Sequence, residues 1–121
     1  MSGNHFTIEQ DNSTVVAHVH LNDLTRLETD QLLDEMRQFM AKVGGRHFVI
    51  DMTQVEYLDS SVIGSLVTFL IEVDKNDGRL ALVHCQPSVM ELVKITGLDT
   101  HILLVDSVAA AAIKMEQRDA A

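Results

Sequence analysis

Three short polar residues, Asp59-Ser60-Ser61, stand between an apolar stretch and a long apolar helical pattern. A serine hydroxyl can act as a nucleophile, cap a helix or accept a phosphoryl group. The Gly-x-Ser-x-Gly motif of serine hydrolases is absent, because Leu58 and Val62 occupy the positions of its glycines around Ser60. No sequence spacing pairs a serine with a histidine, although three histidines could approach it in space: His47, His84 and His101. A catalytic serine is therefore the weakest of the three interpretations.

The same motif is typical of a helix N-terminus. Asp and Ser are preferred N-caps, because their oxygens accept hydrogen bonds from the free N–H groups of the first helical turn. A helix N-terminus also favours anionic groups, so a phosphate at its tip would be tolerated. The sequence predicts a cap at Asp59-Ser60-Ser61 and leaves open which serine is exposed.

Other residues that could bind a metal or a nucleotide lack the required spacing. His18, His20, His84 and Cys85 include zinc-ligand types, but no Cys-x-x-Cys or His-Glu-x-x-His pattern occurs. Gly44-Gly45-Arg46 matches neither the Walker motif nor Gly-x-Gly-x-x-Gly. We therefore expect no metal and no cofactor.

Charge and composition limit the classes of partner. The 121 residues carry 18 acidic and nine basic side chains, a net charge of −9, and the basic residues are scattered. Nucleic acid and anionic membranes need concentrated positive charge, so we expect a basic protein surface as the partner instead. A single cysteine, no signal-peptide pattern and apolar runs too short to span a bilayer predict a cytoplasmic protein without membrane insertion.

Hydrophobic periodicity predicts the elements that position the motif. Strands are expected at 6–9, 15–21, 47–52, 80–84 and 102–105, the first two joined by a turn at 11–13. Helices are expected from Thr25 to Val43, from the serine motif to about Val73, from Pro87 to Gly97, and from Val108 to about Gln117. The last helix has Asp106 or Ser107 as its cap.

This order predicts an α/β fold: one domain over residues 1–121, with an ordered core from about 5 to 117. The continuous apolar strands that alternate with helices indicate a parallel arrangement, and the opening hairpin makes the sheet mixed. We expect a mostly parallel sheet of four to five strands packed with about four helices.

The run FVIDMTQVEYLDSSVIGSLV, residues 48–67, closely resembles the centre of STAS domains, specifically the bacterial anti-sigma factor antagonists. Three later segments resemble the family's next strand, its Pro-x-Val…Thr-Gly-Leu helix and its closing helix: 78–83, 87–98 and 106–111. The family's glycine after the serine pair is Val62 here, and Asn22-Asp23-Leu24-Thr25 replaces its Gly-x-Leu-Asp motif.

The resemblance implies a regulator without catalytic activity of its own. Its unphosphorylated form would bind a serine-kinase-type anti-sigma factor and so free a sigma factor for transcription. Phosphorylation of Ser60, with Ser61 as the alternative, would switch this binding off, and a PP2C-type phosphatase would restore it. The implied partner-binding residues are Asp23, Asp59, Ser60, Ser61 and Val62.

Val62 in place of the family glycine leaves a second function open. The chain could be a STAS scaffold, or a subunit of a transport system, with a degenerate or redirected switch. Such a protein would bind no kinase-fold partner.

Overall fold

A mixed five-stranded sheet forms the centre of the computed structural model, which describes residues 5–42 and 44–120. The spatial order is β1-β2-β4-β6-β7; β1 is antiparallel to β2, and the other neighbours are parallel. The strands are β1 Phe6–Asp11, β2 Thr14–Val19, β4 His47–Asp51, β6 Leu80–Val83 and β7 Leu103–Val105. The predicted mixed, mostly parallel sheet is thus confirmed.

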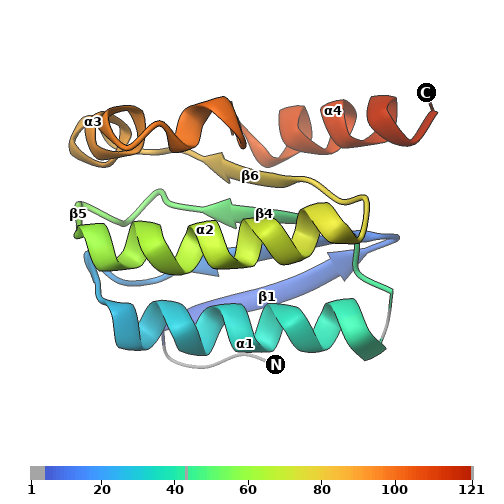
Figure 1. Cartoon of the computed structure of the whole chain (residues 1–121), viewed down its shortest axis with the longest axis horizontal. Helices are drawn as coiled ribbons and strands as arrows, with labels where there is room; N and C mark the ends of the chain where they lie inside the picture. Colours follow the sequence, from blue (N-terminus) through green and yellow to red (C-terminus); the bar gives the residue numbers. More distant parts are fainter. Residues whose placement is uncertain (1–4, 43, 121) are drawn as a thin grey trace.

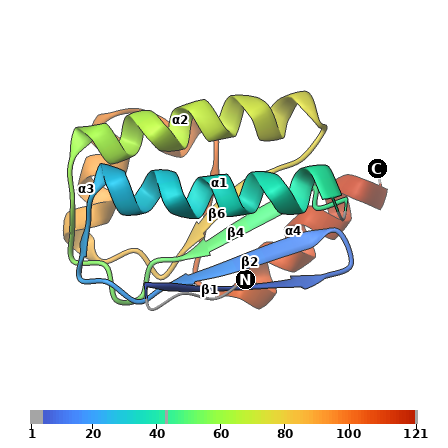
Figure 2. The ribbon, with the colours of Figure 1, turned by 90° about the horizontal axis from the view of Figure 1, so that it is seen from below.

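Within the described residues, four α-helices pack around the sheet, as the sequence predicts. Figure 2 shows α1 (Arg26–Lys42) and α2 (Ser60–Lys75) on one side of the sheet and α4 (Val108–Ala120) on the other. The shorter α3 (Pro87–Ile95) lies at the end where α2 begins (Figure 1). Within the described ranges, no helix combines the length and the apolar character needed to cross a bilayer.

The central strand β6 is apolar throughout, and β4 has apolar residues at its centre, because both faces of the sheet are covered there. Along β4, Phe48 and Ile50 belong to the larger core under α1, α2 and α3, whereas Val49 belongs to the smaller core under α4. Leu82 and Ala81 of β6 divide between the two cores in the same way. Alternate side chains therefore hold helices on opposite faces of one sheet.

Several element ends differ from the sequence prediction. The second strand ends at Val19 and not at Leu21, because the chain turns there toward a short strand β3, Asp23–Leu24. The last helix runs to Ala120, and Ser107 is its cap, since its hydroxyl accepts a hydrogen bond of 3.0 Å from the Ala110 N–H. Val43, predicted as helical, and chain ends 1–4 and 121 lie outside the described residues.

A second, two-stranded sheet is not predicted by the sequence. It pairs β3 in parallel with β5, Tyr57–Leu58, so that Asp23 lies opposite Tyr57. The N–H groups of Glu56 and Tyr57 both donate to the Asn22 carbonyl, at 2.8 and 3.1 Å. These bonds join the loop before α1 to the loop before α2.

Candidate functional site

The serine motif lies where α2 begins, at the edge of the molecule that receives the carboxyl ends of the parallel strands. Asp23 reaches the same region through the pairing of β3 with β5, which ends one residue before Asp59. The structure therefore places Asp23 beside the segment that leads into Asp59 and Ser60, although 36 positions separate Asp23 from Asp59 in sequence (59 minus 23). Asp23, Asp59 and Ser60 are all exposed.

Asp59 caps α2, as the sequence predicts. Its Oδ1 accepts hydrogen bonds from the N–H groups of Ser61 at 2.9 Å and Val62 at 3.2 Å, and from the Ser61 hydroxyl at 2.5 Å. The bond from the Ser61 hydroxyl and that from the Val62 N–H hold the pKa of Asp59 below its usual value. Asp59 is therefore a carboxylate at neutral pH and stabilises the first turn of α2.

The two serines have different environments. The Ser61 side chain is half-buried and its hydroxyl is used by Asp59. Ser60, the first residue of the helix, is exposed, and its hydroxyl makes no hydrogen bond within the described part of the chain. Ser60 therefore presents the accessible hydroxyl at this helix tip.

The sequence model of the STAS domain family matches residues 7–111, which is most of the chain. This chain belongs to the STAS domain family. Three solved structures have the same fold, each at an identity that shows the fold alone. An anti-sigma-factor antagonist STAS domain protein from Planctomyces limnophilus has a TM-score of 0.80 at 21% identity, over 92% of this chain and 97% of that one. The predicted resemblance is confirmed.

The other two structures are a putative anti-sigma factor antagonist from Thermotoga maritima and the Bacillus cell fate determinant SpoIIAA in its phosphorylated form. The first has a TM-score of 0.79 at 19% identity, over 93% of this chain and 96% of that one. SpoIIAA has a TM-score of 0.70 at 19% identity, over 90% of this chain and 96% of that one.

The prediction that Val62 binds the partner is not supported by its position in the structure. Its side chain is 0% exposed and belongs to the larger core. Val62 donates its N–H to Asp59, so its backbone shapes the helix tip while its side chain points inward. We therefore remove Val62 from the partner-binding surface of this STAS domain.

Gly64 and Arg26 belong to the exposed surface beside the serines, which the sequence analysis did not predict. With Ser61, Ser65 and Thr68 they line a depression of about 330 Å³ between α1 and α2. A Cβ at Gly64 would meet no heavy atom within 4 Å, so packing does not require a glycine there. Since glycine costs about 1 kcal/mol relative to alanine inside a helix, its role must be sought in the open surface that it leaves. A glycine within an apolar helical pattern is the sequence signal for this position.

The histidines of the described residues do not form a catalytic pair with Ser60. His47 is buried at the start of β4, at the opposite end of the sheet, where its Nδ1 accepts a hydrogen bond of 3.1 Å from the Arg79 N–H. His84 and His101 are exposed, and neither is hydrogen-bonded to Ser60. Across residues 5–42 and 44–120, no three His, Cys, Asp or Glu side chains form a group that could hold a metal ion. Burial raises the pKa of the Cys85 thiol to about 11.

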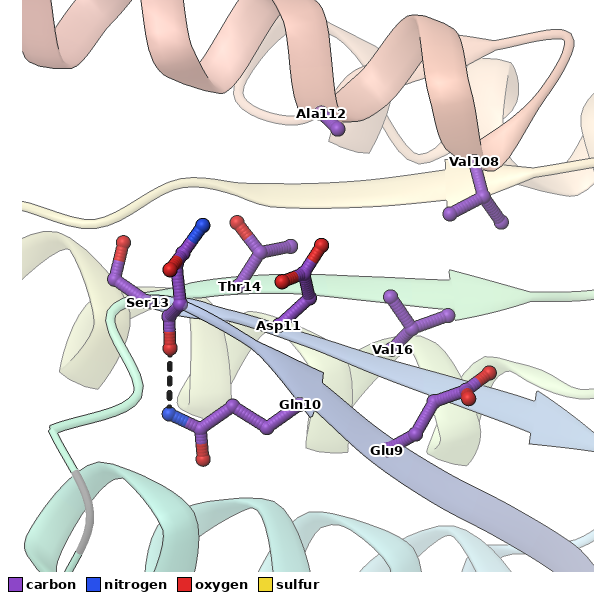
Figure 3. A pocket seen from close by; sticks show the side chains of 9 residues that line it. Glu9, Gln10, Asp11, Ser13, Thr14, Val16, Val108 and Ala112 are labelled. Atoms are coloured by element: carbon purple, nitrogen blue, oxygen red, sulfur yellow. Dashed lines mark hydrogen bonds between the residues drawn. The ribbon is translucent and has the colours of Figure 1, made fainter.

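A hollow of about 480 Å³ lies between the β1–β2 hairpin and α4, with Val108 and Ala112 on its α4 side (Figure 3). Its other lining residues include Thr14, at the amino-terminal end of β2. The hollow is thus at the opposite end of the strands from Ser60 and shares no residue with the serine motif. It is not part of the candidate site.

His18 links three strands on the α4 side of the sheet. Its Nδ1 lies 2.8 Å from the Asp51 carboxylate and its Nε2 lies 3.0 Å from the Glu9 carboxylate. Both nitrogens can donate only in the protonated ring. Burial lowers the pKa of His18, but the hydrogen bonds to Asp51 and Glu9 outweigh burial and raise it above 6.5.

This cluster predicts a pH-dependent stability. Because the folded pKa of His18 exceeds the unfolded value, the stabilisation is complete below the unfolded pKa and is lost as pH rises through the folded pKa. We expect the melting temperature of the wild type, minus that of His18→Gln, to fall between about pH 6 and pH 8. Thermal unfolding followed by circular dichroism measures this difference. A difference that stays constant or grows with pH would contradict the charged-histidine arrangement.

Proposed function

We propose that this STAS domain is an anti-sigma factor antagonist of a partner-switching pathway in the bacterial cytoplasm. Its unphosphorylated form binds a serine-kinase-type anti-sigma factor and frees a sigma factor. Phosphorylation of Ser60 by that partner ends the binding, and a PP2C-type phosphatase restores it. The single observation that carries the proposal is the exposed hydroxyl of Ser60 at the first position of α2, which has no hydrogen-bond partner among the residues that the structure describes.

The cap of α2 explains how the chain accepts the phosphate. Asp59 and Ser61 provide the capping bonds, so Ser60 is not needed for them. A phosphate on Ser60 would lie at the positive end of the helix dipole, which favours negative charge. Phosphorylation therefore leaves the fold in place and changes the charge of the exposed tip. SpoIIAA, a STAS structure at 19% identity, has been determined in a phosphorylated form, which supports this proposal.

The partner contacts the surface around Ser60, which carries Asp23 and Asp59 and the open face at Gly64. With a net charge of −9, the chain best fits a basic surface on the partner. The added phosphate brings about −1.5 to −2 charges beside the Asp59 carboxylate, and it weakens binding because the part of the partner that meets Ser60 itself is an apolar or acidic patch, with the basic residues placed around it. This role requires no catalysis by the chain itself and no nucleic acid.

Phosphorylation assays test the proposal. We expect at least one of the purified serine-kinase-type anti-sigma factors of the same organism to phosphorylate the chain with ATP, and mass spectrometry to place the phosphate on Ser60. Ser60→Ala removes the modification, whereas Ser61→Ala, the matched control, retains it. Phosphorylation that persists in the Ser60→Ala, Ser61→Ala double variant would overturn the proposal, as would the absence of phosphorylation by every such kinase.

A further inference from the structure

A groove of about 300 Å³ lies between β5 and α3, close to the start of α2. The segment around β5 contributes Glu56, Tyr57 and Leu58, and α3 contributes Ser88, Glu91, Leu92 and Ile95. The four helix positions have the spacing i, i+3, i+4 and i+7, which places them on one face of α3. The groove is therefore a continuous surface formed by two elements.

The groove is held in place by hydrogen bonds on both sides. The Ser88 hydroxyl donates to the Glu56 carbonyl at 2.6 Å, which fixes the start of α3 against the loop. The Glu56 N–H also donates a hydrogen bond to the Asn22 carbonyl. Leu58 and Leu92 are half-buried and pack against the larger core, so the floor of the groove is part of the folded domain. A preformed surface loses little freedom when a partner binds.

The chemistry of the groove is apolar with an acidic rim. Tyr57 is 66% exposed and Ile95 is 73% exposed, two of the six most exposed large hydrophobic side chains among the described residues. Their exposure has no role in packing the domain. Glu56 and Glu91 are also exposed, and the lining contains no basic residue. Such a surface fits an aliphatic side chain flanked by lysine or arginine.

The groove is close enough to Ser60 for one partner to contact both. Leu58 lies two residues before Ser60, and two residues of extended chain span at most about 7 Å. We propose that this groove is a docking site for a basic segment of the serine-kinase-type anti-sigma factor, one with an aliphatic residue between cations. The inference rests on the proposed function and adds a second contact that does not involve the phosphorylated residue.

A kinetic experiment tests the docking site in the full chain. Ile95→Lys places a cation in the groove at an exposed position, so folding is preserved. We expect the KM for phosphorylation of Ser60 to rise about tenfold while kcat stays unchanged. The matched control is Ile113→Lys, which changes a 56% exposed isoleucine on α4 and should leave KM unchanged. A KM for Ile95→Lys within about twofold of the wild type would overturn the inference.

A peptide experiment gives a result that does not depend on the kinase. A short peptide of alternating lysine and leucine is added to the isotope-labelled chain. We expect it to shift the NMR signals of Leu58, Leu92 and Ile95, whereas a matched peptide of glutamate and leucine should not. Shifts that spread over other surfaces, or equal shifts with both peptides, would overturn the inference that the groove is a docking site. If peptide binding is seen but no kinase modifies Ser60, the proposed function fails; if Ser60 is modified but the groove variants behave as wild type, only the docking site fails.

Discussion

Phosphorylated on Ser60, this STAS domain is expected to bind the proposed partner, a serine-kinase-type anti-sigma factor, about 100-fold more weakly than the unmodified chain. Such a loss requires only about 2.7 kcal/mol, which one mismatched, desolvated phosphate can supply. Because Asp59 holds the cap of α2 without help from the Ser60 hydroxyl, the melting temperature should remain nearly unchanged. Titration calorimetry of both forms with the partner measures the affinity.

Substitutions at Ser60 separate charge from shape. Ser60→Asp should weaken binding about tenfold, since it adds one charge where phosphate adds about −1.5 to −2. Ser60→Asn is the matched control, because asparagine is nearly the same size as aspartate and carries no charge. Its affinity for the partner should be much closer to that of the wild type. Ser60→Ala should bind constitutively even when kinase and ATP are present. If Asn weakens binding as much as Asp, shape and not charge controls the contact.

The second large effect concerns Val62, where the family has glycine. Val62→Gly should lower the free energy of unfolding by about 3 kcal/mol, because a fully buried valine contributes about 1.5–3 kcal/mol and glycine in a helix costs about 0.5–1 kcal/mol more. Urea denaturation measures this change. In this chain, the start of α2 has thus been built around a buried side chain.

A second valine on α2 provides the control for this prediction. Val67 is 39% exposed, whereas Val62 is 0% exposed. Val67→Gly should lower the free energy of unfolding by about 1–2 kcal/mol, less than Val62→Gly, because the partly exposed Val67 side chain has less buried surface to lose. Equal losses for the two variants would show that Val62 contributes through helix propensity alone and not through the core.

The main elements of the fold follow from local patterns, and the exceptions show what such patterns omit. A strand such as 80–83 is apolar over its full length, and α2 starts at a run of capping residues, so both can be predicted from neighbouring residues. The two-residue strands β3 and β5 cannot, because two residues are too short to show a period. They form only because the loops before α1 and α2 are brought side by side by the larger sheet.

The candidate site divides in the same way. The cap at Asp59 and the two adjacent serines can be predicted from local sequence, since N-capping depends on residues within one turn of the helix. Three features depend on the packed fold: Ser60 presents the exposed hydroxyl, Val62 points into the core, and α3 completes a groove beside Leu58. Local spacing does not specify them, because exposure and contact between distant segments depend on how the helices pack on the sheet.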